Sequence, residues 1–253
     1  MPITRREIYI EIFRAEEAGC DVVVSESINF RILTLDSIFE QSAFALADPL
    51  RLVHEHTRIM MLVMAFASPR KVLMLGLGGG SVLRTLHHHF PSLEFDVVEL
   101  RARVIEAATA FFQVPDDSRV RCHHRDAQDY LQAAPPESVD LVFADLYHAY
   151  DMETYQGNVL FLRDCFQVLT RHGWLVINFH DFPDTSTPFF RIMVALFPDC
   201  FVCDSRKANF ILFCCKSRLN TSIRTFRPEV KALEALLQQP LTPLFSRFFR
   251  IPS

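Results

Sequence analysis

From Lys71 to Cys215, short apolar runs alternate with longer segments in which apolar residues recur at helical spacing. The apolar runs predict strands over residues 72–75, 95–99, 120–123, 139–144 and 174–178, with two closing strands over 200–203 and 210–215. The segments between them predict helices over 81–90, 102–112, 127–133, 155–169 and 187–196, with His172 and Gly173 as the stop signal of the fourth. Strands that alternate with helices at this spacing predict an α/β fold with a doubly wound, mostly parallel, Rossmann-like seven-stranded sheet.

The segments on either side of this region follow other patterns. Runs rich in β-forming residues over 21–25 and 30–36, separated by a turn-like stretch, predict a small antiparallel sheet. A helix with one apolar face is predicted over 50–66, and another helix over 228–238. We therefore divide the chain into a small N-terminal β-domain (1–48), a Rossmann-like domain (49–216) and a C-terminal helical tail (217–253).

The composition limits the class of protein. The chain has 253 residues, of which 50% are hydrophobic and 22% charged, and this is enough to bury a large core. The net charge is −4 and no block of basic residues stands out, so we expect no nucleic-acid partner. No apolar run is long enough to span a bilayer, and acids interrupt the apolar stretch at the N-terminus, so we expect no membrane partner and no signal peptide. The seven scattered cysteines are typical of reduced thiols, and a soluble cytoplasmic protein is predicted.

The strongest chemical signal is a cluster of glycines between the first strand and the first helix of the alternating region. The run reads Leu75-Gly-Leu-Gly-Gly-Gly80, so four of the seven glycines of the chain fall within five positions. Glycine lets a backbone turn tightly and approach a ligand closely. This concentration predicts a ligand-binding turn.

Three acidic residues stand at the ends of successive predicted strands. Glu99 follows the glycines by about 20 residues, the place from which a carboxylate accepts hydrogen bonds from both hydroxyls of a ribose. Asp126 can accept a hydrogen bond from the exocyclic amine of adenine, and Asp145 ends the next strand. Because ligands of open α/β sheets bind beyond the carboxyl ends of the strands, we expect the acids and the glycine turn to line one crevice.

On these residues, the chain resembles the spermidine synthase (polyamine aminopropyltransferase) family, within the class I S-adenosylmethionine-dependent methyltransferase-like fold. The resemblance covers most of the chain outside the tail. Its motifs are Leu35-Asp36 with Gln41, Val53-His-Glu55, Lys71 to Gly76, Val82-Leu-Arg84, Val98-Glu99, Arg119-Val120, Asp126-Ala127, Asp140-Leu-Val142 and Asp145. Many methyltransferases share the glycine turn and the acid after it, whereas fewer share Gln41, His54-Glu55 and Leu83-Arg84.

The resemblance implies a transferase that moves an aminopropyl group from decarboxylated S-adenosylmethionine to a small-molecule amine, and it implies a homodimer. The nucleoside would lie across the glycine turn, with Glu99 on its ribose and Asp126 at its adenine, while Gln41 and His54 close over it. The implied cofactor-binding residues are Gln41, His54, Gly76, Gly78, Gly79, Gly80, Glu99, Asp126 and Ala127.

The resemblance places the acidic residue Asp145 near the attacking amine, as the catalytic residue of the site. An amine has a pKa near 10 in water and must lose a proton before it attacks. Asp145, helped by Tyr147 or His148 as substrate-binding residues, can position the amine and receive that proton.

Two positions depart from the family pattern. The family has an acid between the glycines where this chain has Gly79, and a second acid beyond the fourth strand where this chain has His148. Such acids help bind cationic amines and repel a cofactor that keeps its own carboxylate. Because the Gly79 N–H can even donate to a carboxylate, we treat full S-adenosylmethionine as an open alternative co-substrate.

The sequence is also compatible with other functions. The same crevice suits a methyltransferase acting on a small molecule, and it suits a nucleoside-binding protein without turnover. The histidines at 87–89 are consecutive on one predicted helix and point in different directions, so we expect no metal. The apolar end of the tail, with Phe245, Phe248 and Phe249, fits either a subunit interface or the core.

Overall fold

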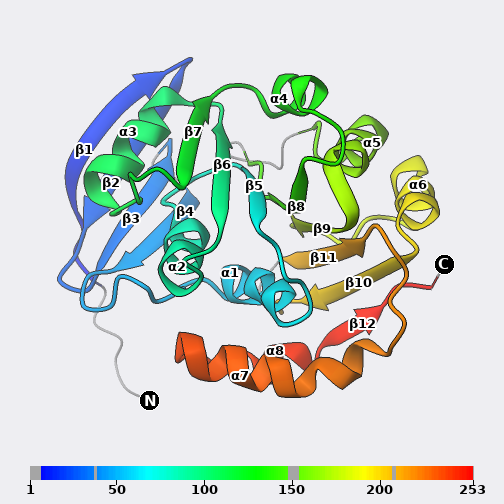
Figure 1. The fold of residues 1–253 in the computed structure, drawn as a ribbon. Helices are drawn as coiled ribbons and strands as arrows, with labels where there is room; N and C mark the ends of the chain where they lie inside the picture. The colour runs from blue at the N-terminus through cyan, green and yellow to red at the C-terminus, as the bar shows by residue number, and fades with distance from the viewer. Residues whose placement is uncertain (1–6, 37–38, 148–153, 207–208, 253) are drawn as a thin grey trace.

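The N-terminal residues form a small antiparallel sheet, as expected. The computed structural model describes residues 7–36, 39–147, 154–206 and 209–252. The small sheet has the order β1-β2-β3-β4 and consists of β1 (Ile10–Glu17), β2 (Cys20–Glu26), β3 (Phe30–Leu35) and β4 (Phe39–Ala45). Val22, Val24 and Leu33 turn one face of this sheet toward helix α3 (Ala102–Phe111), which packs against both β1 and β2. The helix thereby joins the small sheet to the larger one (Figure 1).

The main sheet confirms the predicted α/β class. Its order is β12-β10-β11-β9-β8-β5-β6-β7. The parallel strands are β5 (Lys71–Leu75), β6 (Glu94–Glu99), β7 (Val120–His124), β8 (Val139–Ala144) and β9 (Leu169–Phe179). The antiparallel strands at one edge are β10 (Asp199–Asp204), β11 (Phe210–Cys215) and β12 (Phe248–Arg250). The expected number of seven strands is wrong by one, because the tail contributes β12, which pairs with β10 and is too short to leave a pattern in the sequence.

Helices cover both faces of the main sheet (Figure 1). Met74 and Phe143 point to one face, where α1 (Glu55–Met60), the 3-10 helix η1 (Met61–Ala65), α2 (Ser81–His89) and α7 (Arg227–Leu237) pack. Their neighbours Leu75 and Ala144 point to the other face, under α4 (Ala127–Ala133), α5 (Val159–Val168) and α6 (Pro188–Leu196). Within the described ranges, none of the helices is both long and apolar enough to cross a bilayer.

The predicted helix over 50–66 is shorter than expected. It begins only at Glu55, and its second half is the 3-10 helix η1. The preceding backbone is bound by side chains from elsewhere: the Leu52 N–H donates to Gln239 Oε1 at 2.9 Å, and the Leu50 carbonyl oxygen accepts from Gln239 Nε2 at 3.2 Å. These tertiary hydrogen bonds replace the helical ones that local pattern predicts.

The stop signal at His172 and Gly173 is also wrong. The helix begins at Val159, capped by Asn158, and ends at Val168, and β9 starts at the next residue. Gly173 therefore lies inside a strand, where an added Cβ would stand 2.9 Å from Leu169 Cδ2 and 3.0 Å from the Thr170 carbonyl oxygen. The glycine permits close packing within β9 rather than the end of a helix.

The C-terminal tail closes the molecule at one edge and one face. It carries the 3-10 helix η2 (Ile223–Phe226), α7, α8 (Thr242–Phe245) and β12. Arg247 forms an ion pair with Glu55 at 2.8 Å, which fixes the start of α1. Phe245 and Phe248 are buried in the core, whereas 58% of Phe249 is exposed. Of the two alternatives for the tail, subunit interface or core, the first two phenylalanines therefore belong to the core.

A buried arginine ties the small sheet to the glycine turn. Arg84 on α2 lies over the Phe44 ring at 4.7 Å. Its Nη1 donates to the carbonyl oxygens of Phe112 (2.7 Å) and Gly79 (3.2 Å), and its Nε donates to that of Pro49 (2.7 Å). Burial lowers the pKa of Arg84 to about 10. The guanidinium is still charged at neutral pH, so all three bonds are charge-assisted.

We expect Arg84→Met to lower the free energy of unfolding by about 3 kcal/mol, because three carbonyl oxygens lose their donor. Denaturant unfolding measures this change. Arg103→Met is the control, because the Arg103 side chain forms an exposed ion pair with Glu106, and the loss of this pair should cost less than about 1 kcal/mol. Equal losses in the two variants would contradict the role given to Arg84.

Candidate functional site

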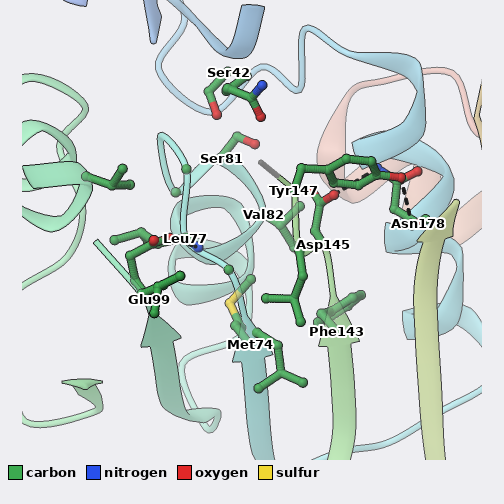
Figure 2. Close-up of a pocket in the computed structure, with 18 of the residues that line it drawn as sticks. Ser42, Met74, Leu77, Ser81, Val82, Glu99, Phe143, Asp145, Tyr147 and Asn178 are labelled. Atoms are coloured by element: carbon green, nitrogen blue, oxygen red, sulfur yellow. Dashed lines mark hydrogen bonds between the residues drawn. The ribbon is translucent and has the colours of Figure 1, made fainter. Parts of the chain in front are cut away.

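A cavity of about 350 Å³ opens at the carboxyl ends of the central strands, between the main sheet and β4 (Figure 2). It lies where open α/β sheets bind their ligands. Of the residues singled out from the sequence, its wall includes Gln41, His54, Gly76, Gly78, Glu99, Asp126, Ala127, Asp145, Tyr147 and Gly80. His148 lies outside the described residues. Among the described residues, no three metal-binding side chains gather into a cluster.

The glycine turn brings two strand ends close together. Gly76 has φ +90°, and a Cβ there would stand 2.4 Å from the backbone oxygen of Asp145. The turn then enters α2 through Gly80 in the left-handed region. Only glycine satisfies both the conformation and the close approach at residue 76. The turn therefore sets the distance between its own backbone and the strand end that carries Asp145.

Gly79 does not lie on the cavity wall but behind it. Its N–H donates to Ser42 Oγ at 2.8 Å, and a Cβ at this position would stand 2.9 Å from Ser42 Cβ and 3.0 Å from Phe112 Cδ1. The idea that this N–H meets a cofactor carboxylate is thus wrong, because Ser42 already accepts it. Ser42 reaches the turn from β4 and lines the cavity, a role that sequence alone did not indicate.

Glu99 is buried at the end of β6 and faces the turn (Figure 2). Its Oε2 accepts from the Leu77 N–H at 3.0 Å, and its Oε1 accepts from the Arg101 N–H at 2.9 Å. Burial raises the pKa of Glu99 above its ordinary value, and the two backbone donors oppose that rise. The carboxylate therefore stiffens the glycine turn while it remains on the cavity wall.

Asp126 caps the next helix. Its Oδ1 accepts from the backbone N–H groups of Gln128 (2.8 Å) and Asp129 (3.1 Å), so the side chain is fixed at the start of α4. Ala127 beside it is buried and also lines the cavity. The sequence pattern thus placed both residues correctly at a strand end, and the cap explains why the aspartate is held in one orientation.

Asp145 belongs to a hydrogen-bonded group on the side of the cavity away from Glu99 (Figure 2). Its Oδ1 accepts from Asn178 Nδ2 at 2.8 Å, and the Asn178 side-chain oxygen accepts from Asn209 Nδ2 at 2.9 Å. The Asn178 carbonyl oxygen accepts from Tyr147 Oη (2.9 Å) and from the buried Gln156 Nε2 (2.8 Å). Asn178 is the centre of this group. Its position near the end of β9 is the one feature of the sequence that could have indicated a role in the site.

Three histidines line another part of the wall. His54 and His56 stack with their ring centroids 5.2 Å apart, and His54 Nε2 lies 3.2 Å from Glu40 Oε1 on β4. His180 follows β9 and lies 4.6 Å, centroid to centroid, from the Tyr147 ring. His56 and His180 both line the cavity, although sequence reasoning named neither as a site residue.

Comparisons with known proteins agree with this geometry. A family model described as a methyltransferase domain matches residues 72–173. The polyamine aminopropyltransferase of Chromobacterium violaceum is 32% identical over 166 residues, which are 65% of this chain and 63% of that enzyme. The match therefore spans less than two thirds of the length of this relative.

Solved structures are similar over more of the chain. A probable spermidine synthase from Corynebacterium glutamicum has a TM-score of 0.76 at 20% identity and covers 88% of this chain and 86% of its own. Human Methyltransferase-like protein 13 in complex with SAH has a TM-score of 0.64 at 26% identity and covers 74% of this chain and 94% of its own. The resemblance drawn from the motifs is thereby confirmed: the chain is similar in sequence and in fold to the polyamine aminopropyltransferases, within the broader methyltransferase fold.

Proposed function

We propose that this chain is a transferase that moves an aminopropyl group from decarboxylated S-adenosylmethionine to an amine acceptor. The observation that carries the proposal is the position of Asp145, whose carboxylate is held by Asn178 on the wall of a cavity that Glu99 and the glycine turn also line. An anion at that end attracts an ammonium group, while the other end offers acceptors for a ribose. The names of the relatives support the same activity.

The hydrogen bonds of the glycine turn support the decarboxylated co-substrate. The N–H groups of Gly76, Leu77, Gly79 and Gly80 already donate to Val98 O, Glu99 Oε2, Ser42 Oγ and Leu77 O. A turn with four N–H groups used in this way has few donors left for the carboxylate of full S-adenosylmethionine, the N–H of Gly78 among them. The decarboxylated co-substrate has no carboxylate that would need these donors.

The proposed reaction needs orientation and one proton transfer. The neutral amine attacks the aminopropyl carbon next to the sulfonium, a C–N bond forms, and the C–S bond breaks with its electron pair moving to sulfur. The leaving thioether needs no proton. Holding the amine and the sulfonium in line supplies much of the rate, and Asp145 would provide that positioning for the amine.

Turnover with defined co-substrates tests the proposal. The protein is incubated with either decarboxylated or full S-adenosylmethionine and a panel of mono-, di- and triamines, and the products are identified by mass spectrometry. Aminopropylated amine from the decarboxylated co-substrate alone is expected. Methylated amine from full S-adenosylmethionine would instead establish the methyltransferase alternative, and binding of 5′-methylthioadenosine without any product would establish the non-catalytic one.

The ionisation of Glu99 gives a separate prediction for nucleoside binding. Affinity for 5′-methylthioadenosine is expected to fall as the pH drops through the raised pKa of Glu99, because a protonated carboxyl is a weaker acceptor for ribose hydroxyls. Stability changes in the opposite direction: a pKa raised by folding favours the folded state at low pH, and this contribution is lost as the pH rises through that pKa. Calorimetry across this range, with Glu99→Gln as the pH-independent control, checks the prediction. An equal pH dependence in the variant would contradict it.

We further propose a cytoplasmic homodimer. Exposed apolar side chains on and beside the edge strand β1, those of Ile8, Ile10 and Ile12, support an association between copies. Six of the seven cysteines are buried free thiols, which suits a reducing compartment. Light scattering after size-exclusion chromatography measures the assembly, and a monomer at micromolar concentration would contradict it.

A further inference from the structure

His56 is a wall residue of the cavity to which the proposed reaction gives no role so far. It is the second residue of α1, a helix that packs against β9 and β11, and its side chain lines the same cavity as Asp145 and His180. The start of this helix is fixed by the Glu55–Arg247 ion pair. His56 is therefore a fixed group at the acceptor end of the cavity, not a side chain on a mobile surface.

The imidazole of His56 is available to a ligand. Within the described part of the chain its ring nitrogens have no hydrogen-bond partner, and the ring stacks on that of His54. Burial lowers the pKa of His56, and His180 lowers it further, while the carboxylate of Asp145 acts in the opposite direction. The ring is therefore neutral at pH 7 and can accept a proton.

We propose that His56 is the catalytic base that accepts the proton of the acceptor amine. This role rests on the proposed aminopropyl transfer. The amine enters as an ammonium ion, which the carboxylate of Asp145 attracts. Its proton moves to the imidazole of His56, and the nitrogen gains the lone pair that attacks the aminopropyl carbon.

The proton and the electrons balance over one turnover. The C–N bond forms from the amine lone pair, and the C–S bond breaks with its pair left on sulfur, so the sulfonium charge passes to the new secondary ammonium. The imidazolium of His56 then gives its proton to water. Each turnover releases one proton, and no oxidant or further reactant is needed.

The neighbouring groups are less suited to this task. Tyr147 already donates to the Asn178 carbonyl oxygen, and burial raises the pKa of its phenol, so it stays protonated. His180 is exposed to water. A carboxylate is a weak base toward an ammonium ion with a pKa near 10, and an imidazole is a stronger one. The anion of Asp145 instead stabilises the imidazolium that forms.

Charged and titratable groups face His56 from several elements. Asp145 follows β8, His180 follows β9, and His54 precedes α1, with Glu40 Oε1 of β4 lying 3.2 Å from its Nε2. Because the ionisation of these groups also changes with pH, the pH profile of a His56 variant has to be compared with that of wild-type protein, which contains the same groups.

The test compares His56→Gln with wild-type protein over a range of pH. We expect kcat at pH 7 to fall roughly 100-fold, with the Kd for 5′-methylthioadenosine unchanged. The loss should shrink as the pH approaches about 10, because the amine then arrives already neutral. A structural defect would not be relieved by pH in this way. His88→Gln, on the exposed part of α2, is the matched control and should keep wild-type kcat at every pH.

The outcomes separate this role from the proposed function. A wild-type protein that transfers no aminopropyl group to any amine overturns the proposed function and, with it, the role of His56. Wild-type turnover with less than about a threefold loss in His56→Gln, or with a loss that stays constant up to high pH, overturns the role of His56 alone. Thermal melting checks that the variant folds. If the variant does not fold, His56→Asn replaces it. The pH profile of wild-type kcat is then measured as well, and its acidic limb is expected below the ordinary pKa of histidine.

Discussion

Asp145→Asn is expected to lower kcat/KM for the amine about 1000-fold, or about 4 kcal/mol, while the Kd for 5′-methylthioadenosine stays unchanged. The amide keeps the size of the side chain but loses the charge that attracts the ammonium ion and stabilises an imidazolium at His56. Nucleoside affinity should survive because Glu99 lies on the other side of the cavity (Figure 2). Steady-state kinetics with calorimetry on the same preparation measures both quantities.

The matched control for this variant is Asp116→Asn, which neutralises an exposed carboxylate. It should keep wild-type kinetics, which shows that a change in net charge is not the cause. Alkaline pH should not rescue Asp145→Asn, in contrast to His56→Gln, because a neutral amine still lacks its positioning anion. Activity within tenfold of wild type would show that Asp145 does not hold the amine.

Gly76→Ala is expected to abolish measurable nucleoside binding and to lower the free energy of unfolding by about 4 kcal/mol. The new Cβ would stand 2.4 Å from the backbone oxygen of Asp145, and φ of +90° adds a conformational penalty of roughly 1–2 kcal/mol. Relief of the overlap has to separate β5 from β8 and costs roughly 1–3 kcal/mol more. Denaturant unfolding and calorimetry measure the two effects.

Gly19→Ala separates strain from overlap. Gly19 also has a positive φ, +78°, but a Cβ there meets no atom within 4 Å. This control should lose only the conformational part, roughly 1–2 kcal/mol, and should bind nucleoside normally. If the two variants lost equal stability and Gly76→Ala still bound nucleoside, the close approach of the turn to Asp145 would not be needed for nucleoside binding.

Local pattern was sufficient where one segment carries its own signals. The strands at 139–144 and 210–215 and the helix at 127–133 lie where the sequence predicts them. Compact apolar runs define the two strands, and Asp126 caps the helix from the adjacent position. The acids at the strand ends were predictable for the same reason, since parallel topology brings the ends of such strands to one edge of the sheet.

Features fixed by distant contacts left no comparable signal. The start of α1 depends on Gln239, which lies 187 residues from Leu52. Ser42 and His56 reach the cavity only because β4 and α1 pack against its rim. Neither residue type is unusual in its local sequence, so tertiary placement alone gives them their positions.

The late position of the tail in the chain has a consequence for biosynthesis. Gln239 holds the approach to α1, Arg247 holds its first residue, and Phe248 to Arg250 cover the edge of β10. These partners follow the central strands in the chain, so a nascent chain can form those strands while the helix that bears His56 is still unanchored. The part of the cavity wall that His56 forms is therefore expected to be completed later in folding than the glycine turn and the strand ends that carry the acids.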